Sequence, residues 1–181
     1  MKVTPLELEG LYLLEPIVHG DHRGYFMETY NEAILQRLGL QVRFVQDNHS
    51  LSKEKGVIRG LHYQLPPKAQ TKLVRVLAGA IYDVVVDLRR QSPTFGKWIG
   101  IILSEENKRQ LFVPKGFAHG FCTLTPNTQV FYKVDEFYAP EYDRGIRWDD
   151  PSLQIDWPVS DPVLSDKDRS HPDFKYAELG F

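Results

Sequence analysis

The sequence predicts an all-β protein built as an antiparallel sandwich or barrel. Short apolar runs of about four to eight residues, rich in valine, isoleucine and aromatic residues, recur along most of the chain. Turn sequences such as Ala78-Gly79-Ala80 and Thr125-Pro126-Asn127 separate them, and this spacing is typical of sandwiches and barrels. We therefore expect strands at residues 25–30, 42–46, 57–64, 72–77, 81–88, 98–103, 110–113, 120–124 and 130–134.

The length and composition indicate one domain. The chain has 181 residues, of which 42% are apolar and 25% charged, a composition typical of globular proteins. That length supports one substantial core and falls short of two ordinary domains. We expect a single domain over residues 1–181, with the barrel core at about 25–135 and a proline-interrupted tail at about 158–181 wrapping the barrel. A helix capped by Asn31 and ended by Gly39 is also expected, with a short helical turn in the tail.

The charge and the apolar pattern exclude several classes of function. The net charge is −2, so the protein as a whole does not attract nucleic acid or anionic membranes, and any bound anion needs a local cluster of cations. No apolar run approaches the roughly 18 residues of a membrane span, and the N-terminus lacks the apolar stretch of a secretory signal. Cys122, the only cysteine, is expected to be a small buried side chain in a strand. We expect a cytoplasmic protein with neither nucleic-acid nor membrane partners.

No sequence pattern indicates a cofactor or a metal. A glycine-rich loop between a strand and a helix, which would bind a dinucleotide or a phosphate, is absent. His19 and His22 are three residues apart, but glycines and a charged loop surround them. None of the six histidines forms the His-x-His pair with a following Glu that metal-binding barrels commonly use. We therefore expect no metal and no cofactor.

Three polar side chains stand in strand-forming sequence. Period-2 alternation puts His62 on one face of its strand together with Gly60 and Gln64. Lys72 and Tyr132 each share a strand face with valines, which predicts that they point into the barrel. Polar groups that point inward are costly unless they are paired or used. Each residue alone is consistent with a structural role, whereas a base, a fixed cation and a phenol together favour catalysis.

This combination suits proton abstraction beside a carbonyl. Histidine, with an ordinary pKa near 6.5, is a suitable base at neutral pH. The α-proton of a ketone is less acidic than a protonated histidine by on the order of ten pKa units. At ~1.4 kcal/mol per unit, the carbanion therefore lies ~14 kcal/mol above the starting ketone with a free histidine base. A desolvated ammonium beside the developing enolate oxygen lowers that step, and Lys72 is the candidate. A phenol on the opposite face of the ring, here Tyr132, can return a proton and invert the carbon.

Ordered motifs from about residue 3 to residue 170 resemble the dTDP-4-dehydrorhamnose 3,5-epimerase family. Any one of them is unspecific, whereas six or more in the same order are highly specific. They are Gly20-Asp21-His22-Arg23-Gly24, Phe44-Val45-Gln46-Asp47-Asn48-His49-Ser50, Arg59-Gly60-Leu61-His62-Tyr63-Gln64, Lys72-Leu73-Val74-Arg75, Pro114-Lys115-Gly116-Phe117-Ala118-His119-Gly120-Phe121, Tyr132-Lys133-Val134, Tyr138-Ala139-Pro140 and Leu164-Ser165-Asp166-Lys167-Asp168.

The resemblance implies a fold, an activity and partners. It implies a cupin-type antiparallel jelly-roll barrel with short peripheral helices, a homodimer, and action without metal or nucleotide cofactor. The substrate would be a dTDP-linked 4-keto-6-deoxyhexose. The reaction would be epimerisation at C3 and C5 of dTDP-4-dehydro-6-deoxy-D-glucose, giving dTDP-4-dehydro-L-rhamnose in dTDP-L-rhamnose synthesis.

The resemblance also implies roles for individual residues. His62 resembles the family's base, oriented by an aspartate that matches Asp168. Lys72 matches the residue near the enolate and also contacts the substrate, and Tyr132 matches the general acid. The matching substrate-binding positions are Arg23, Glu28, Gln46, Asp47, Asn48, Arg59, His119, Tyr138, Asp143 and Lys167. Among these, Arg23, Arg59 and Lys167 match cations that meet the diphosphate, and Tyr138 matches a ring that stacks on thymine.

Several alternatives stay open at this point. Arg59 and His62 fall on opposite faces of an ideal strand, so both serve one site only if Gly60 relaxes the strand or Arg59 sits at its mouth. Asp83 is a second candidate partner for His62 beside Asp168. Asp143 stands where some members carry Glu. The rival functions are a single-position epimerase or keto-isomerase on a related nucleotide sugar, and a non-catalytic sugar-binding barrel.

Overall fold

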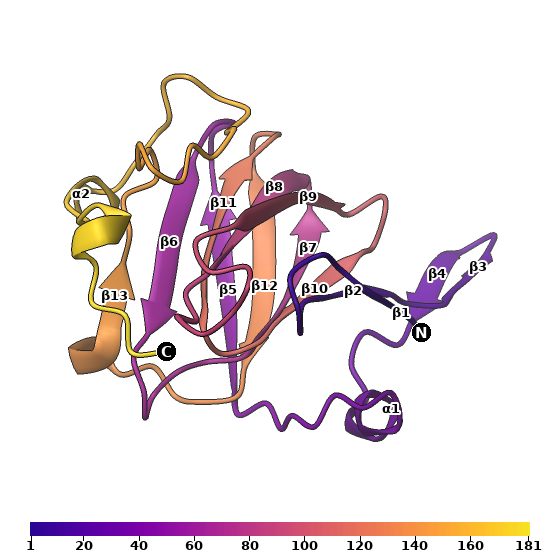
Figure 1. Ribbon diagram of the computed structural model, residues 1–181. Coiled ribbons are helices and arrows are strands. Elements are labelled where there is room, and N and C mark those ends of the chain that lie inside the picture. Colours follow the sequence, from indigo (N-terminus) through magenta and orange to yellow (C-terminus); the bar gives the residue numbers. More distant parts are fainter.

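The computed structural model describes residues 1–181, and its framework is two antiparallel sheets that face each other (Figure 1). The six-stranded sheet has the order β1-β2-β10-β7-β12-β5, and the five-stranded sheet has the order β13-β6-β11-β8-β9. Every strand pair in both sheets is antiparallel, so the predicted all-β jelly-roll architecture is confirmed. The strands are β1 (Lys2–Pro5), β2 (Tyr12–Glu15), β3 (Val18–Asp21), β4 (Gly24–Met27), β5 (Gln46–Ser52), β6 (Ile58–Gln64), β7 (Lys72–Ala78), β8 (Ala80–Asp87), β9 (Trp98–Ser104), β10 (Gln110–Val113), β11 (Phe117–Thr123), β12 (Thr128–Val134) and β13 (Asp143–Gly145).

Helices are few and short. They are α1 (Glu32–Arg37), α2 (Asp166–Arg169) and the 3-10 turns η1 (Pro140–Tyr142) and η2 (Phe174–Tyr176). The predicted cap of α1 is confirmed, because the Asn31 side chain accepts a hydrogen bond from the backbone N–H of Ile34. Gly39 follows the helix with a φ of +85°, a left-handed conformation that glycine adopts without steric cost. No helix of the structure has the length and apolarity that crossing a membrane requires.

Strand alternation divides the apolar side chains among three clusters. One cluster fills the space between the two sheets and includes Val74, Val85 and Val130. A second covers the outer face of the five-stranded sheet, where Trp157 and Ala177 of the C-terminal segment pack together with Cys122 and its neighbours. A third lies on the outer face of the six-stranded sheet, beneath α1. The polar side chains that point between the two sheets, such as His62 and Lys72, therefore lie together beside the apolar cluster that fills this space.

One predicted strand is wrong, and another is shorter than predicted. Residues 42–46 do not form a strand, and β5 begins at Gln46 instead. Its inward face carries Gln46, Asn48 and Ser50, so the strand has no apolar alternation by which to recognise it. The predicted strand 25–30 ends at Met27, and β4 pairs only with β3, outside both sheets. Figure 1 shows this β3–β4 hairpin projecting from the body of the molecule, on the side away from α2.

Candidate active site

A polar cavity of about 290 Å³ lies between the two sheets and beside α2. The five-stranded sheet contributes residues of β6 and β11, the six-stranded sheet contributes residues of β5, β7 and β12, and α2 and its cap close one side. Its lining is Ser50, Arg59, His62, Lys72, His119, Phe121, Tyr132, Ser165, Lys167 and Asp168. A smaller cavity of about 170 Å³ shares His62, Lys72, Tyr132 and Lys167 with it, and adds Tyr63, Gln64, Gln70, Tyr138 and Asp143.

A bulge in β6 brings Arg59 and His62 to the same cavity. His62 pairs with His119 and Arg59 pairs with Phe121, so two residues of β6 lie opposite one residue of β11. The extra residue reverses the alternation, and Arg59 therefore shares the inward face with His62. The backbones of β6 and β11 lie so close together here that a Cβ added to Gly60 would be only 2.5 Å from the Cα of Gly120. Glycine is therefore required at residue 60, and the bulge lets the side chains of Arg59 and His62 serve one site.

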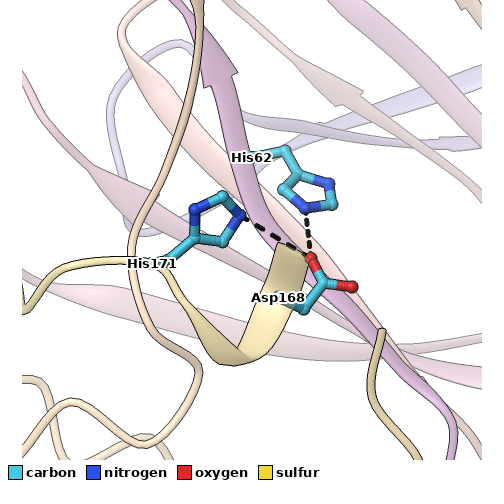
Figure 2. Close-up of side chains that lie close together, drawn as sticks. All are labelled: His62, Asp168 and His171. Carbon is cyan, nitrogen blue, oxygen red and sulfur yellow. Dashed lines mark hydrogen bonds and ion pairs between the residues drawn. The ribbon is translucent and has the colours of Figure 1, made fainter. Parts of the chain in front are cut away.

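His62 is paired with Asp168, which comes from a different part of the chain. The two side chains point toward each other (Figure 2), and the His62 Nε2 atom lies 2.5 Å from Oδ1 of Asp168. The Ser165 hydroxyl, which caps α2, donates to the other carboxylate oxygen at 2.8 Å. Burial alone would raise the pKa of Asp168, but the hydrogen bonds from His62 and Ser165 outweigh it and lower that pKa below its usual value. The carboxylate is therefore charged at neutral pH and can orient the imidazole.

Lys72 and Tyr132 lie on neighbouring strands of the opposite sheet. Tyr132 pairs with Val74 and Val134 pairs with Lys72, so both polar side chains occupy the inward face. Lys72 is buried, and burial lowers the pKa of its ammonium to about 8 although Asp143 and Asp83 oppose the shift. Burial likewise raises the pKa of the Tyr132 phenol. At neutral pH this places a protonated phenol on the sheet opposite His62 and a charged ammonium 3.4 Å from the backbone carbonyl oxygen of His62.

A second histidine–aspartate pair lies deeper in the five-stranded sheet. His119 of β11 is the cross-strand neighbour of His62, and its Nε2 atom lies 2.7 Å from Oδ1 of Asp83 on β8. Both side chains are buried, and the second carboxylate oxygen of Asp83 has no hydrogen-bond partner. The structure thus brings Asp168 to His62 and assigns Asp83 to His119.

Cations and ring groups line the mouth of the cavity. Arg59 donates to the Ser52 hydroxyl at 3.1 Å and to the backbone carbonyl of Leu51 at 3.2 Å. The Lys167 ammonium lies 2.5 Å from a carboxylate oxygen of Asp143, and the Tyr138 hydroxyl donates to that same oxygen at 3.0 Å. Arg59 and Lys167 are therefore two cations at one cavity, the local cluster that an anion needs in a protein of negative net charge.

The three predicted binding residues of β5 are divided between two faces. Gln46 and Asn48 occupy the inward face with Ser50, and their amide groups are hydrogen-bonded to each other at 2.9 Å. Of the three, only Ser50 lines the cavity. Asp47 lies on the outer face, where its carboxylate is 2.8 Å from the ammonium of Lys133. Asp47 is thus not brought to the cavity within one chain, because alternation along a regular strand sends neighbouring side chains to opposite faces.

Arg23 and Glu28 are not at this cavity either. Arg23 lies on the β3–β4 hairpin, where it forms an ion pair with Asp21 and borders a separate surface hollow. Glu28 follows the hairpin and accepts a hydrogen bond from Asn31 at 3.2 Å. The physical reason is that the hairpin pairs with neither sheet and projects from the barrel (Figure 1).

His171 is a residue that the sequence analysis did not single out. It follows α2, and its ring lies 5.4 Å from the ring of His62, centroid to centroid. Both histidines point to the same Asp168 oxygen (Figure 2), and the His171 Nε2 atom is 3.7 Å from it. Burial, and then the nearby His62, lower the pKa of His171 below its ordinary value. The only signal in the sequence is its position three residues after Asp168, one helical turn away.

The family model and the curated relatives share one description. The family model described as dTDP-4-dehydrorhamnose 3,5-epimerase matches residues 5–176. A relative of that name from Methanothermobacter thermautotrophicus is 57% identical, over 90% of this chain and 89% of its own.

Two solved structures superimpose closely. The dTDP-4-dehydrorhamnose 3,5-epimerase of Bacillus anthracis, solved with TDP and PPi bound, is 59% identical with a TM-score of 0.94, covering 95% of this chain and 98% of its own. The dTDP-6-deoxy-D-glucose-3,5-epimerase of Legionella pneumophila, solved with dTDP-4-keto-L-rhamnose, is 47% identical with a TM-score of 0.92, covering 97% and 93%. These scores confirm the cupin-type jelly roll. With its sequence matched almost end to end and its barrel superimposed, the chain belongs to the dTDP-4-dehydrorhamnose 3,5-epimerase family.

Proposed function

We propose that this protein converts dTDP-4-dehydro-6-deoxy-D-glucose to dTDP-4-dehydro-L-rhamnose by inverting C3 and C5, a step of dTDP-L-rhamnose synthesis. One observation carries the proposal. A histidine held by a buried aspartate and a phenol on the opposite sheet face each other across one cavity, with a buried lysine beside them. Binding alone requires neither a base nor an acid, so this arrangement favours catalysis over a sugar-binding barrel.

His62 is the base of the proposed reaction. Since its Nε2–H donates to Asp168, the neutral imidazole carries its lone pair on Nδ1, which is free to take the proton. The Asp168 carboxylate stabilises the imidazolium that forms. Both C3 and C5 flank the same C4 carbonyl, so one base can serve both carbons after the sugar ring shifts.

Lys72 stabilises the enolate and Tyr132 delivers the new proton. A buried ammonium beside the C4 oxygen interacts far more strongly with developing negative charge than one in water. Inversion requires that the second proton arrive from the face opposite the base. His62 lies on the five-stranded sheet and Tyr132 on the six-stranded sheet, so a sugar between them is approached from both faces.

The remaining polar residues bind the nucleotide and the diphosphate. Arg59 and Lys167 supply positive charge for the diphosphate, in a chain whose net charge would otherwise repel it. The exposed ring of Tyr138 offers a stacking surface for thymine, and the inward amides of Gln46 and Asn48 offer hydrogen bonds. His119 lines the cavity floor, and Asp143 positions Lys167 and Tyr138.

Arg23 and Glu28 take part in the proposal only through a second copy of the chain. Their hairpin leaves its own barrel and exposes two large rings, with Tyr25 58% and Phe26 72% accessible. Apolar rings on an unpaired hairpin are a surface that association would bury. We infer a homodimer in which this hairpin reaches the cavity of the other copy and brings Arg23 and Glu28 to its substrate.

The reaction is tested by incubating the protein with dTDP-4-keto-6-deoxyglucose in D2O and locating the label by NMR. We expect deuterium at both C3 and C5, with inversion at both. Label at one carbon only would instead support a single-position epimerase. Label at neither carbon would refute the enzyme assignment for this substrate.

The shared site is tested by mixing two inactive variants. His62→Ala lacks the base and Arg23→Ala lacks the hairpin cation, but a mixed dimer contains one site with both groups intact. After subunit exchange at equal concentrations, about a quarter of wild-type activity should return, because half of the dimers carry one intact site. If Arg23 served its own barrel, no mixing ratio would restore activity.

We also infer a cytoplasmic location. The proposed substrate is a nucleotide-linked sugar, and enzymes that make and consume such sugars share the compartment of the nucleotide pool. Fractionation of the source cells, followed with the NMR assay, tests this inference, and activity confined to a membrane or secreted fraction would contradict it.

A further inference from the structure

Three potential metal ligands meet at one wall of the catalytic cavity, and one of them has no hydrogen-bond partner. They are Nε2 of His62, a carboxylate oxygen of Asp168 and Nε2 of His171, all within 4.8 Å of one another (Figure 2). The His171 side chain is only 10% exposed, and its Nε2 atom forms no hydrogen bond. A buried nitrogen without a partner is costly unless something occupies the space before it.

Each ligand is held in place by its surroundings. His62 lies on β6, and Asp168 is fixed by the Ser165 cap of α2. The His171 ring lies directly against the backbone of Gly145 on β13, so closely that any Cβ there would clash with the ring. His171 lines neither cavity, so it contacts the pair His62–Asp168 from the side away from the substrate.

The geometry is close to what a zinc ion requires. Two imidazole nitrogens and one carboxylate oxygen are a common three-ligand set for zinc, with a fourth position left to water. Bond lengths of about 2.0 to 2.1 Å in a tetrahedral site put the ligand atoms roughly 3.3 Å apart. The Asp168 oxygen lies 2.5 Å from His62 and 3.7 Å from His171, and all three ligand atoms are within 4.8 Å of one another, so side-chain shifts of about 1 to 2 Å create the site.

We propose that His62, Asp168 and His171 form a reversible inhibitory site for zinc. Coordination at Nε2 of His62 displaces the proton that this nitrogen shares with Asp168. In the neutral imidazole that proton moves to Nδ1, which then has no lone pair with which to accept a proton from the sugar. Zinc therefore switches off the base, a consequence that rests on the proposed role of His62.

The charges around the cluster set the affinity. Two carboxylates attract a divalent cation to the cluster: Asp168 as a ligand and Asp143 from β13. Three nearby cations repel it: Lys167 of α2, Lys72 of β7 and Arg59 of β6. With one carboxylate ligand and three cations nearby, we expect binding in about the micromolar range, weaker than a structural zinc site. A site of that strength is occupied only when free zinc rises, which suits inhibition better than permanent retention.

The test is calorimetric titration of the full-length, chelator-treated protein with zinc, in parallel with activity assays. Wild type should bind one zinc per chain and lose activity over the same zinc range, and chelation should restore it. His171→Phe keeps a ring against Gly145 and removes the ligand, so zinc affinity should fall by more than the about 10- to 100-fold that losing a hydrogen-bond partner of a ligand costs. Its activity, compared with its own zinc-free activity, should not fall over the zinc range that inhibits wild type.

Two further variants keep the test decisive. His171→Asn supplies a smaller side chain in case the Phe variant does not fold, which circular dichroism will show. His49→Gln removes an exposed histidine on the outer face of β5 and should bind zinc as wild type does.

Equal zinc affinity in wild type and both His171 variants would overturn the site, as would the absence of saturable binding. Activity that persists with zinc bound would overturn the inhibition. Calorimetry needs no turnover, so these results are independent of whether the sugar is epimerised.

Discussion

The two histidine–aspartate pairs of this protein are chemically alike but differ in exposure and in origin. In His62–Asp168 the aspartate comes from the C-terminal helix, and the histidine side chain is 32% exposed. In His119–Asp83 the two residues sit on adjacent strands, and the histidine side chain is 7% exposed. An exposed imidazole can exchange protons with a ligand and with water, whereas an enclosed one is a fixed hydrogen-bonding group. We therefore expect the first pair to move protons and the second to hold the cavity floor in place.

Removing the two histidines should separate these roles most strongly. His62→Ala deletes the base, so turnover and solvent exchange at C3 and C5 should fall by ~10³-fold or more. Binding of dTDP, measured by calorimetry, should stay close to wild type, because affinity comes from the diphosphate and thymine contacts. His119→Ala should lower turnover much less. A His62→Ala protein that still exchanged either proton at a substantial rate would move the base to another group, with His119 first to be tested.

Asp168→Asn is the next largest expected effect. The amide can still accept from His62, but it no longer offers the negative charge that stabilises the imidazolium. We expect kcat to fall by ~10²-fold with little change in dTDP affinity. The pKa of Asp168 is lowered in the folded protein, so its carboxylate stays charged down to pH values well below neutral, and its contribution is lost only as the pH falls through that value. A wild-type kcat in Asp168→Asn would show that the pairing is structural.

Tyr132→Phe tests the group opposite the first pair. The ring still packs beside Val130 and Val134, and only the proton donor is removed. Removal and return of a proton on the face of His62 should continue, so deuterium should still enter the starting isomer. Net inversion should fall by ~10²-fold or more. If the Phe variant inverted the sugar at the wild-type rate, Tyr132 would be a packing residue and another group the acid.

The pH profile should report the charge of Lys72. Burial lowers its pKa to about 8, so the ammonium loses its proton as the pH rises through that value. We expect kcat/KM, which reflects the free enzyme, to fall about tenfold per pH unit above about 8. Lys72→Arg should abolish this alkaline limb, because a guanidinium stays protonated throughout. A profile that is flat up to pH 10 would show that the substrate-free enzyme keeps Lys72 charged.

The sequence and the structure agree best where burial governs the pattern. The β-branched runs of β7 and β8 predicted their strands to within a residue or two, because both faces of these strands are largely buried. β5 was missed because its inner face carries the polar side chains Gln46, Asn48 and Ser50, of which Ser50 lines the cavity. A strand that builds a polar site cannot show the apolar alternation that identifies a strand.

The candidate site was predictable where one strand carries the signal and not where tertiary contacts create it. His62, Lys72 and Tyr132 stood out as polar groups in strand sequence. Spacing could not decide between Asp168 and Asp83, because 106 residues separate His62 from Asp168 and only the docking of α2 joins them. The hairpin that carries Arg23 away from its own barrel, and the approach of His171 to Asp168, likewise depend on how distant segments pack.

The smallest expected effect, from Asp83→Asn, sharpens the comparison of the two pairs. Asp83 is fully buried, and one of its oxygens has no hydrogen-bond partner, so an amide of the same shape can still accept from His119 while its NH2 group replaces the unpaired oxygen. We expect kcat to fall by less than about tenfold, against ~10²-fold for Asp168→Asn. The charge of Asp83 helps to keep Lys72 protonated, so removing it should lower the pKa of Lys72 and move the alkaline limb of kcat/KM to lower pH. Steady-state kinetics over pH 6 to 10 on both variants measures the two effects together. A loss in Asp83→Asn as large as that in Asp168→Asn would mean that His119–Asp83 also moves a proton during turnover, and the difference in exposure would then not separate the two roles.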